Sequence, residues 1–317
     1  VMSTLHADSA SLISTHLKNS KRPLLVVLGP TASGKTSFSI QLAKHIGNVE
    51  IVNADSRQFY KYLNIGTAKI TEEEKQGITH HLIDILDPNE ESTAGWYQIE
   101  ATKVVEDIID RGKIPILVGG SMLYISSIID GLSMAPSTTP EIRDRFIKEY
   151  EKDNGKSLYE KLCRVDPKTA EKIHQNNMPR LIRALEIHEL TKTPKSSAVP
   201  NSELRTGNNK KFDTLIFGMK KERNDLVEII NIRTDSMLNS GWIKEVEKLI
   251  EMGYTEKDPG MKSCGYREIY SFLKNGMNIP MKELSEKISA KSRQYAKRQM
   301  TWWRGDDRIN WLSLNDS

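Results

Sequence analysis

Residues 29–36 read Gly-Pro-Thr-Ala-Ser-Gly-Lys-Thr, which matches the pattern G-x-x-x-x-G-K-[ST]. An apolar run, residues 24–28, precedes this motif, and a segment with helical periodicity follows it, so a strand, a tight loop and a helix are predicted. In this context the backbone N–H groups of the loop and the ammonium group of Lys35 bind phosphate oxygens at a helix N-terminus. The motif therefore predicts binding of a diphosphate-like group, but it does not specify a reaction.

Short apolar runs and amphipathic segments alternate after this motif. The runs lie at residues 50–52, 81–86 and 114–118, and residues 95–111 between them carry an apolar helical face. This alternation predicts a P-loop NTPase-like α/β fold, with a parallel sheet flanked by helices. Ligands bind beyond the carboxyl ends of strands in such sheets, so Asp55 is a candidate site carboxylate. A single Asp at this place is otherwise a common turn or helix-cap residue.

The alternation stops after Gly131. Prolines at positions 140, 167 and 179 mark predicted helix starts, and the helices between them are rich in Lys, Glu and Arg. We expect a helical insertion inside a core that ends in further helices. The expected boundaries are 1–22 for a disordered tail, 23–136 and 209–317 for the core, and 137–208 for the insertion.

The second half of the core is predicted to return to the sheet before it becomes helical. Residues 211–219 have the pattern of a strand, and residues 223–304 that of helices broken at Gly241, Gly253 and Gly260.

Composition excludes several classes of protein. The 317 residues contain no apolar run of about 18 residues, and the first 22 lack the apolar core of a signal peptide. Cys163 and Cys264 are far apart and form no C-x-x-C pair, which excludes a disulfide framework and a cysteine zinc site. We expect a cytoplasmic protein, a monomer, with no membrane anchor.

Positive charge is concentrated near the C-terminus. The formal net charge is only +4, yet residues 281–304 hold seven Lys or Arg against two Glu. At about 100° per residue these residues divide into two stripes on one helix. The stripes are Ile288, Tyr295 and Trp302, which we interpret as core, and Arg293, Lys297 and Arg304, which face nearly the opposite way. The basic stripe is either a merely solvated face or a surface for nucleic-acid phosphates.

Six segments in one order resemble the tRNA dimethylallyltransferase family, in its bacterial form. They are residues 29–36, 54–56, 64–69, 118–124, 180–186 and 293–302. The resemblance covers nearly all of residues 23–312. It implies that the loop binds dimethylallyl diphosphate with diphosphate as the leaving group. It further implies that the acceptor is the N6 amine of the adenine immediately 3′ of the anticodon, in tRNAs that read codons beginning with U.

The same resemblance implies roles for individual residues. Asp55 would be the general base on the adenine amine, while Lys35 and Arg233 would stabilise the leaving group. The diphosphate-binding set would be Gly29, Thr31, Ala32, Ser33, Gly34, Lys35, Thr36 and Arg233, with Thr36 as a ligand of Mg²⁺. The tRNA-binding set would be Asp55, Ser56, Arg57, Gln58, Ser121, Arg143, Pro179, Arg180, Leu181, Ile182, Arg183, Lys262, Ser263, Cys264, Gly265, Tyr266, Arg267, Lys297, Arg298, Gln299, Met300, Thr301, Trp302, Trp303 and Arg304.

Three other functions compete with this interpretation. An adenylate isopentenyltransferase would share the loop and Asp55, but it has no need for the helical insertion or the basic C-terminal stretch. An ATP-dependent kinase or ATPase, with Asp84 as an acidic metal ligand, is favoured by the loop alone. A non-catalytic RNA-binding module is disfavoured because Lys35, Thr36 and Asp55 are intact.

Overall fold

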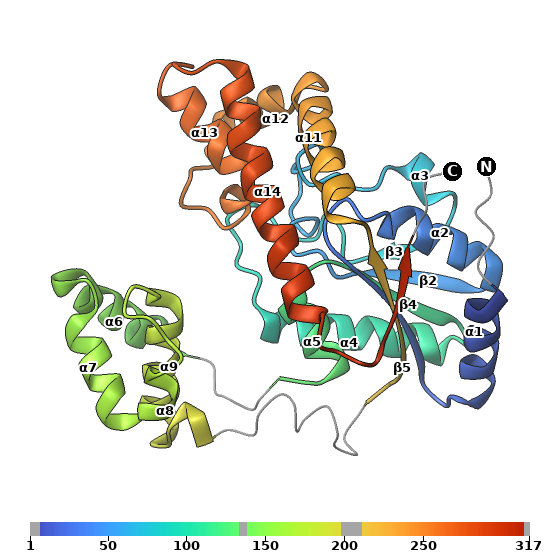
Figure 1. The fold of residues 1–317 in the computed structure, drawn as a ribbon, viewed down its shortest axis with the longest axis horizontal. Helices are drawn as coiled ribbons and strands as arrows, with labels where there is room; N and C mark the ends of the chain where they lie inside the picture. Colours follow the sequence, from blue (N-terminus) through green and yellow to red (C-terminus); the bar gives the residue numbers. More distant parts are fainter. Residues whose placement is uncertain (1–6, 133–137, 198–210, 314–317) are drawn as a thin grey trace. The chain divides into compact units, whose positions relative to one another are not determined.

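The computed structural model describes residues 7–132, 138–197 and 211–313 (Figure 1). The chain divides into two compact units, which we call the core unit (Val1–Ile129 and Lys211–Ser317) and the helical unit (Asp130–Lys210). The helical unit thus begins earlier than the predicted insertion at 137–208, directly after a core helix ends at Ile129. Residues 137 and 198–208 of that prediction lie outside the described residues.

A six-stranded parallel sheet forms the centre of the core unit. Its strands are β1 (Pro23–Leu28), β2 (Val49–Asn53), β3 (His80–His81), β4 (Ile114–Gly119), β5 (Asp213–Lys220) and β6 (Ile309–Ser313), in the order β3-β2-β4-β1-β5-β6. In the register of the sheet, Val26 of β1 aligns with Leu117 of β4 and with Ile216 of β5. The parallel sheet confirms the predicted α/β class.

Helices cover both faces of the sheet. Those of the core unit are α1 (Ala7–Asn19), α2 (Lys35–Ile46), α3 (Glu72–Lys75), α4 (Ala94–Asp110), α5 (Met122–Ile129), α11 (Arg223–Asn239), α12 (Trp242–Glu251), η2 (Gly260–Lys262), α13 (Tyr266–Lys274) and α14 (Met281–Trp303). Because side chains alternate along a strand, Leu24 and Val26 join the core beneath α4 and α5, whereas Leu25 and Val27 join the core beneath α1 and α2. Burial on both faces explains the continuous apolar run of β1.

The N-terminal segment corrects one prediction. A disordered tail was expected over residues 1–22, but residues 7–19 form α1, and residues 1–6 lie outside the described residues. Ile13 is only 2% exposed in the core beside α2, and Nε2 of His16 lies 3.0 Å from the carbonyl oxygen of Asp213. The buried Ile13, the partly buried Leu17 and a contact to β5 therefore fix a segment that is polar in composition.

Two strands also differ from expectation. The run at 81–86 is a strand only at its start, because Leu82 and Asp84 have φ angles of 60° and 56°, outside the extended range. The carboxylate of Asp84 forms an ion pair with Lys69. The second difference is β6, which no sequence pattern indicated and which extends the sheet beside β5.

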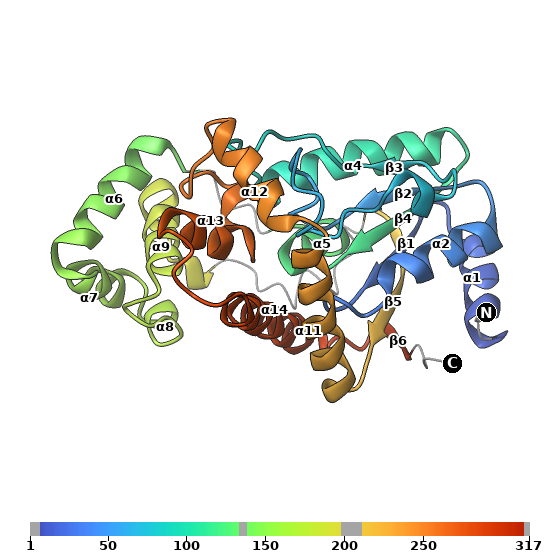
Figure 2. The same ribbon diagram turned by 90° about the horizontal axis from the view of Figure 1, so that it is seen from above.

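The C-terminal helices follow the predicted breaks. A left-handed Gly241 separates α11 from α12, Gly253 follows α12, and Gly260 begins η2. Helices α11 and α14 run side by side (Figure 1 and Figure 2), so they bring residues from distant parts of the sequence together.

The helical unit has a core of its own. Its elements are α6 (Pro140–Asp153), α7 (Lys156–Val165), α8 (Pro167–Ala170), α9 (Met178–Thr191) and η1 (Lys195–Ser197). Phe146, Leu158, Leu162 and Leu181 are completely buried in it. The prolines of α6, α8 and α9 lie in the first helical turn, as predicted, because a missing N–H has no cost there.

Candidate active site

The loop between β1 and α2 depends on close backbone packing. A Cβ atom at Gly29 would come within 2.5 Å of the carbonyl oxygen of Met219, so only glycine fits there. Gly34 has a φ of 90° and precedes α2, and no side chain caps that end of the helix in the described part of the chain. The first backbone N–H groups of α2 can therefore serve a ligand, and the N-terminus of the helix favours a negatively charged one.

Lys35 places a cation beside this loop. Its Nζ atom donates a hydrogen bond to the carbonyl oxygen of Pro30, with a separation of 2.6 Å. Desolvation lowers the pKa of Lys35 to about 8, against the opposing attraction of the Asp55 carboxylate, and the Arg233 guanidinium lowers it further. Desolvation also lowers the pKa of Arg233, which Asp55 again opposes. These interactions bring together the three side chains that were predicted to be catalytic.

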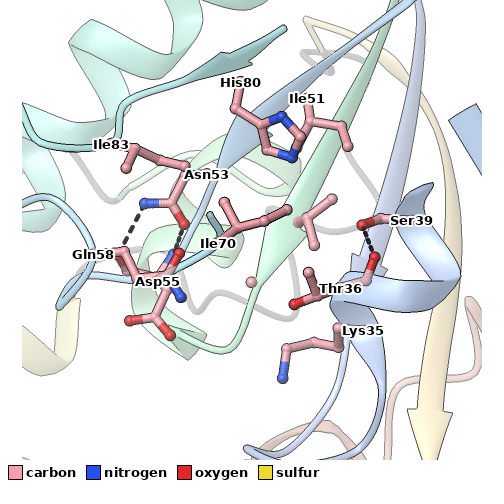
Figure 3. A pocket seen from close by; sticks show the side chains of 12 residues that line it. Lys35, Thr36, Ser39, Ile51, Asn53, Asp55, Gln58, Ile70, His80 and Ile83 are labelled. Atoms are coloured by element: carbon pink, nitrogen blue, oxygen red, sulfur yellow. Dashed lines mark hydrogen bonds between the residues drawn. The ribbon is translucent and has the colours of Figure 1, made fainter. Parts of the chain in front are cut away.

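A cavity of about 760 Å³ in the core unit contains the predicted diphosphate site. It is lined by Thr31, Ala32, Ser33, Gly34, Lys35, Thr36, Asp55, Arg57, Gln58 and Arg233, among others. A smaller cavity of about 50 Å³ shares Lys35, Thr36 and Asp55 with it, and Figure 3 shows Lys35 and Asp55 on opposite sides of this space. An anionic group bound by the loop would thus lie within reach of a carboxylate.

The turn after β2 holds Asp55 in a defined orientation. Its backbone N–H donates to Oδ1 of Asn53 at 2.9 Å, while its own Oδ1 accepts from the backbone N–H of Arg57 at 2.9 Å. The next backbone N–H, that of Ser56, donates to Oγ of Ser121 at 2.8 Å. Asp55 is therefore a turn residue and a cavity residue at once, and the two interpretations from sequence do not exclude each other.

Some residues of the predicted tRNA-binding set are buried. They are Ser121, Leu181, Ile182, Ser263, Gly265, Tyr266, Gln299 and Trp303. The hydroxyl of Tyr266 donates to Glu245 and accepts from the backbone N–H of Gly66, and Gln299 bonds to Thr31 and Gly120. Tyr266 and Gln299 thus form hydrogen bonds within the protein, Ser263 and Gln299 also line the large cavity, and contact of the buried residues with tRNA stays a prediction.

The basic stripe of α14 also needs correction at one end. Arg293 donates to Asn231 and pairs with Glu286, so it is engaged within the protein. Lys297 and Arg304 are exposed, as are the predicted contacts Arg298, Thr301 and Trp302. The basic surface of α14 therefore lies nearer its C-terminal end than predicted.

The aromatic stripe predicted for the core fails only at its last member, since Tyr295 is part-buried and its hydroxyl donates to the carbonyl oxygen of Gly120 at 3.3 Å. Ile288 is buried, but Trp302 is 39% exposed, and the adjacent Trp303 is the buried tryptophan at 2%. The side of α14 that packs against α11 and the sheet decides which tryptophan is enclosed, and periodicity does not reveal that side.

In the helical unit, Arg143 and Arg183 bond to the buried carboxylate of Glu186, at 3.0 Å and 3.4 Å. Pro179 and Arg180 are exposed at the start of α9. In the core unit, Lys262 ends η2 and residues 263–265 connect it with α13, and Ser263 and Cys264 line the large cavity.

Sequence reasoning missed Trp242, which is 2% exposed and lines the large cavity. A Cβ atom at Gly66 or at Gly265 would overlap its indole ring. The sequence signal for this packing is the pair Gly66 and Gly265, whose lack of a side chain leaves room for the indole ring. These two glycines lie nearly 200 residues apart in the sequence.

The described residues contain no group of three or more His, Cys, Asp or Glu that could hold a metal ion. Thr36 and Asp55 nevertheless line both cavities. Mg²⁺ commonly takes one or two protein oxygens and completes its shell with substrate phosphates and water. The residues present therefore fit Mg²⁺ that arrives with a diphosphate.

Comparisons with known proteins agree on one family. A family model described as IPP transferase matches residues 58–306. The tRNA dimethylallyltransferases of Acetivibrio thermocellus and Caldanaerobacter subterraneus are 42% and 43% identical to this chain, over 92% of each chain. Among solved structures, the tRNA delta(2)-isopentenylpyrophosphate transferase of Staphylococcus epidermidis is 40% identical, with a TM-score of 0.66 over 92% of this chain and 93% of that one. A eukaryotic dimethylallyltransferase acting on tRNA is 30% identical, with a TM-score of 0.77 over 93% of this chain and 75% of that one.

The lowered pKa of Lys35 predicts a pH dependence of anion binding. The Lys35 ammonium is charged below its pKa of about 8 and neutral above it, so affinity for inorganic diphosphate is expected to fall as pH rises through that value. Because the bound anion stabilises the ammonium, binding near pH 8 is also expected to take up protons. Calorimetry in buffers of different ionisation enthalpy, across about two pH units, measures both effects. Lys35→Met is the control, because in this variant the pH dependence that comes from the titration of diphosphate itself remains and that of Lys35 is lost. Identical pH profiles of diphosphate affinity for the two proteins would contradict the role of Lys35 in binding the anion.

Proposed function

This chain belongs to the IPP transferase family, and we propose that it transfers a dimethylallyl group from dimethylallyl diphosphate to the N6 amine of the adenine immediately 3′ of a tRNA anticodon. The acceptors are tRNAs that read codons beginning with U. The observation that carries the proposal is one cavity in which a phosphate loop with Lys35 and Arg233 faces the Asp55 carboxylate.

The cationic side of the cavity suits a diphosphate leaving group. Cleavage of the allylic C–O bond places negative charge on the departing diphosphate. Lys35, Arg233 and the backbone N–H groups at the start of α2 are placed to stabilise that charge. Mg²⁺ bound by Thr36 and the diphosphate would add a further positive charge.

Asp55 suits the acceptor side of the reaction. An aromatic amine is a weak nucleophile, and it must lose a proton when its nitrogen bonds to the allylic carbon. A carboxylate held by the N–H of Arg57 can accept that proton without reorientation. The C–N bond then forms while the C–O bond breaks, the proton passes to Asp55, and diphosphate leaves.

Recognition of tRNA is assigned to surfaces outside the cavity. The exposed Lys297, Arg298 and Arg304 of α14 suit backbone phosphates, and in the helical unit Arg180 does so as well. The target base must leave its stack to reach Asp55. The free-energy cost of this unstacking is small in a single-stranded loop. No described helix is long and apolar enough to cross a membrane. A cytoplasmic location and a monomeric state remain expectations.

A direct assay separates this function from its competitors. The protein is incubated with Mg²⁺, labelled dimethylallyl diphosphate and either unmodified tRNA or AMP. Label is expected in tRNA and not in AMP, whereas label in AMP would identify an adenylate isopentenyltransferase. ATP hydrolysis is expected to be negligible, and turnover of ATP without modification of tRNA would establish the kinase or ATPase alternative.

Replacing the general base tests the chemistry. Asp55→Asn keeps the size of the side chain but removes its basicity, so the single-turnover rate at saturating substrates is expected to fall by about 10²–10⁴. Binding of tRNA is expected to be largely retained. The control is Asp87→Asn, which removes an exposed carboxylate that pairs with Lys61. A near-parental rate for Asp55→Asn would remove Asp55 from the role of base.

Replacing one cation of α14 tests the tRNA surface. Lys297→Ala is expected to weaken the binding of all cognate tRNAs by a similar factor and to lower the salt dependence of that binding by about one phosphate contact. The single-turnover rate at saturating tRNA is expected to stay unchanged. Filter binding over a salt series measures both quantities. Lys287→Ala, which removes a cation paired with Glu283 on the same helix, is the matched control. If Lys297→Ala keeps the parental affinity and slope, the face is only solvated and tRNA binds elsewhere.

A further inference from the structure

The side chain of Gln299 links α14 to the phosphate loop. It is 1% exposed, although glutamine is mostly a surface residue. Its Oε1 accepts a hydrogen bond from the backbone N–H of Thr31 at 2.9 Å, and its Nε2 donates to the carbonyl oxygen of Gly120 at 2.8 Å. One amide thus spans the gap between the loop after β1 and the end of β4.

The segment at the end of β4 continues this link to Asp55. The backbone N–H of Ser121 donates to the carbonyl oxygen of Ala54 at 3.1 Å, and the Ser121 hydroxyl accepts from the backbone N–H of Ser56 at 2.8 Å. Asp55 is therefore tied to Ser121 on both of its flanks. A continuous set of hydrogen bonds and backbone runs from Thr31 through Gln299 to the two neighbours of Asp55.

Only an amide satisfies both ends of this link. The backbone N–H of Thr31 requires an acceptor, and the carbonyl of Gly120 takes the amide as the nearer of two donors, the other being the Tyr295 hydroxyl at 3.3 Å. A glutamate would lack the donor, and a methionine of similar size would offer neither. The same turn of α14 presents Lys297 and Arg298 to solvent, so its buried side supports the catalytic loops while its exposed side carries charge.

We infer that Gln299 is a positioning residue, which fixes the phosphate loop relative to Asp55 and thereby sets the alignment of the leaving group with the base. This role rests on the proposed function, in which the phosphate loop binds the leaving group and Asp55 is the base. Gln299 itself contacts the loop backbone and Gly120. A small displacement between donor and acceptor lowers the rate of a two-substrate reaction even when both substrates bind.

The test compares Gln299→Met with the parent and with Ser285→Ala. Ser285 is a buried residue of α14 whose hydroxyl bonds to Asp235 of α11, so its loss removes an interhelical bond without touching the phosphate loop. For Gln299→Met we expect a single-turnover rate at saturating tRNA and dimethylallyl diphosphate about 10–100-fold below the parent. Affinity for inorganic diphosphate is expected to fall about fivefold, and affinity for tRNA to stay within about twofold. Ser285→Ala is expected to lower the melting temperature similarly but to keep the parental rate and diphosphate affinity.

A second variant keeps the test decisive if Gln299→Met does not fold. A Cβ atom at Gly120 would collide with Nε2 of Gln299, so Gly120→Ala displaces the same amide from the other side. It is expected to reproduce the loss of rate and of diphosphate affinity.

Parental rate and diphosphate affinity in a folded Gln299 or Gly120 variant would overturn the inference, as would equal losses in Ser285→Ala. A parent protein that modifies no tRNA would instead refute the proposed function, while its diphosphate affinity, compared with that of the variants, would still test the link between Gln299 and the loop.

Discussion

The site depends on how closely the backbone packs at the carboxyl ends of two neighbouring strands. Gly29 follows β1 against the carbonyl of Met219, and Gly119 ends β4 where a Cβ atom would overlap the backbone of Ala54. These contacts bring the loop after β1 and the turn after β2 to one edge of the parallel sheet. That edge is where open α/β sheets bind their ligands. Helix α14 then closes the arrangement from the C-terminal end of the chain.

The charged side chains of the cavity favour the binding of an anion. Lys35 and Arg233 are partly withdrawn from water, and each is influenced by Asp55. Two desolvated cations near one carboxylate leave an excess of positive charge, which an incoming diphosphate can neutralise. The cavity is therefore organised for an anion before the anion arrives, and little reorganisation is needed as charge develops on the leaving group.

Much of this could be predicted, for physical reasons that also explain the failures. A buried parallel strand gives a continuous apolar run, so the positions of β1 and of the loop that follows it could be predicted from the sequence. Helix α1 was missed because one buried side chain, Ile13, leaves little pattern in a polar segment. The exposure of Trp302 and the burial of Trp303 depend on the contacts that α14 makes with distant elements. The resemblance placed Gln299 among the tRNA contacts, and its burial was not predicted because a sequence does not reveal that both ends of a polar side chain form hydrogen bonds inside the protein.

The indole of Trp242 lies against Gly66 and Gly265 with no room for a Cβ atom at either. One ring thus sets the permitted size of two positions far away in the sequence. A side chain could enter at residue 66 only together with a smaller residue at 242, and at residue 265 it would also meet backbone strain, because φ there is 86°. A smaller residue at 242 alone would leave a void in the wall of the cavity. In any redesign of this wall, the residues at positions 66, 242 and 265 therefore have to be chosen together.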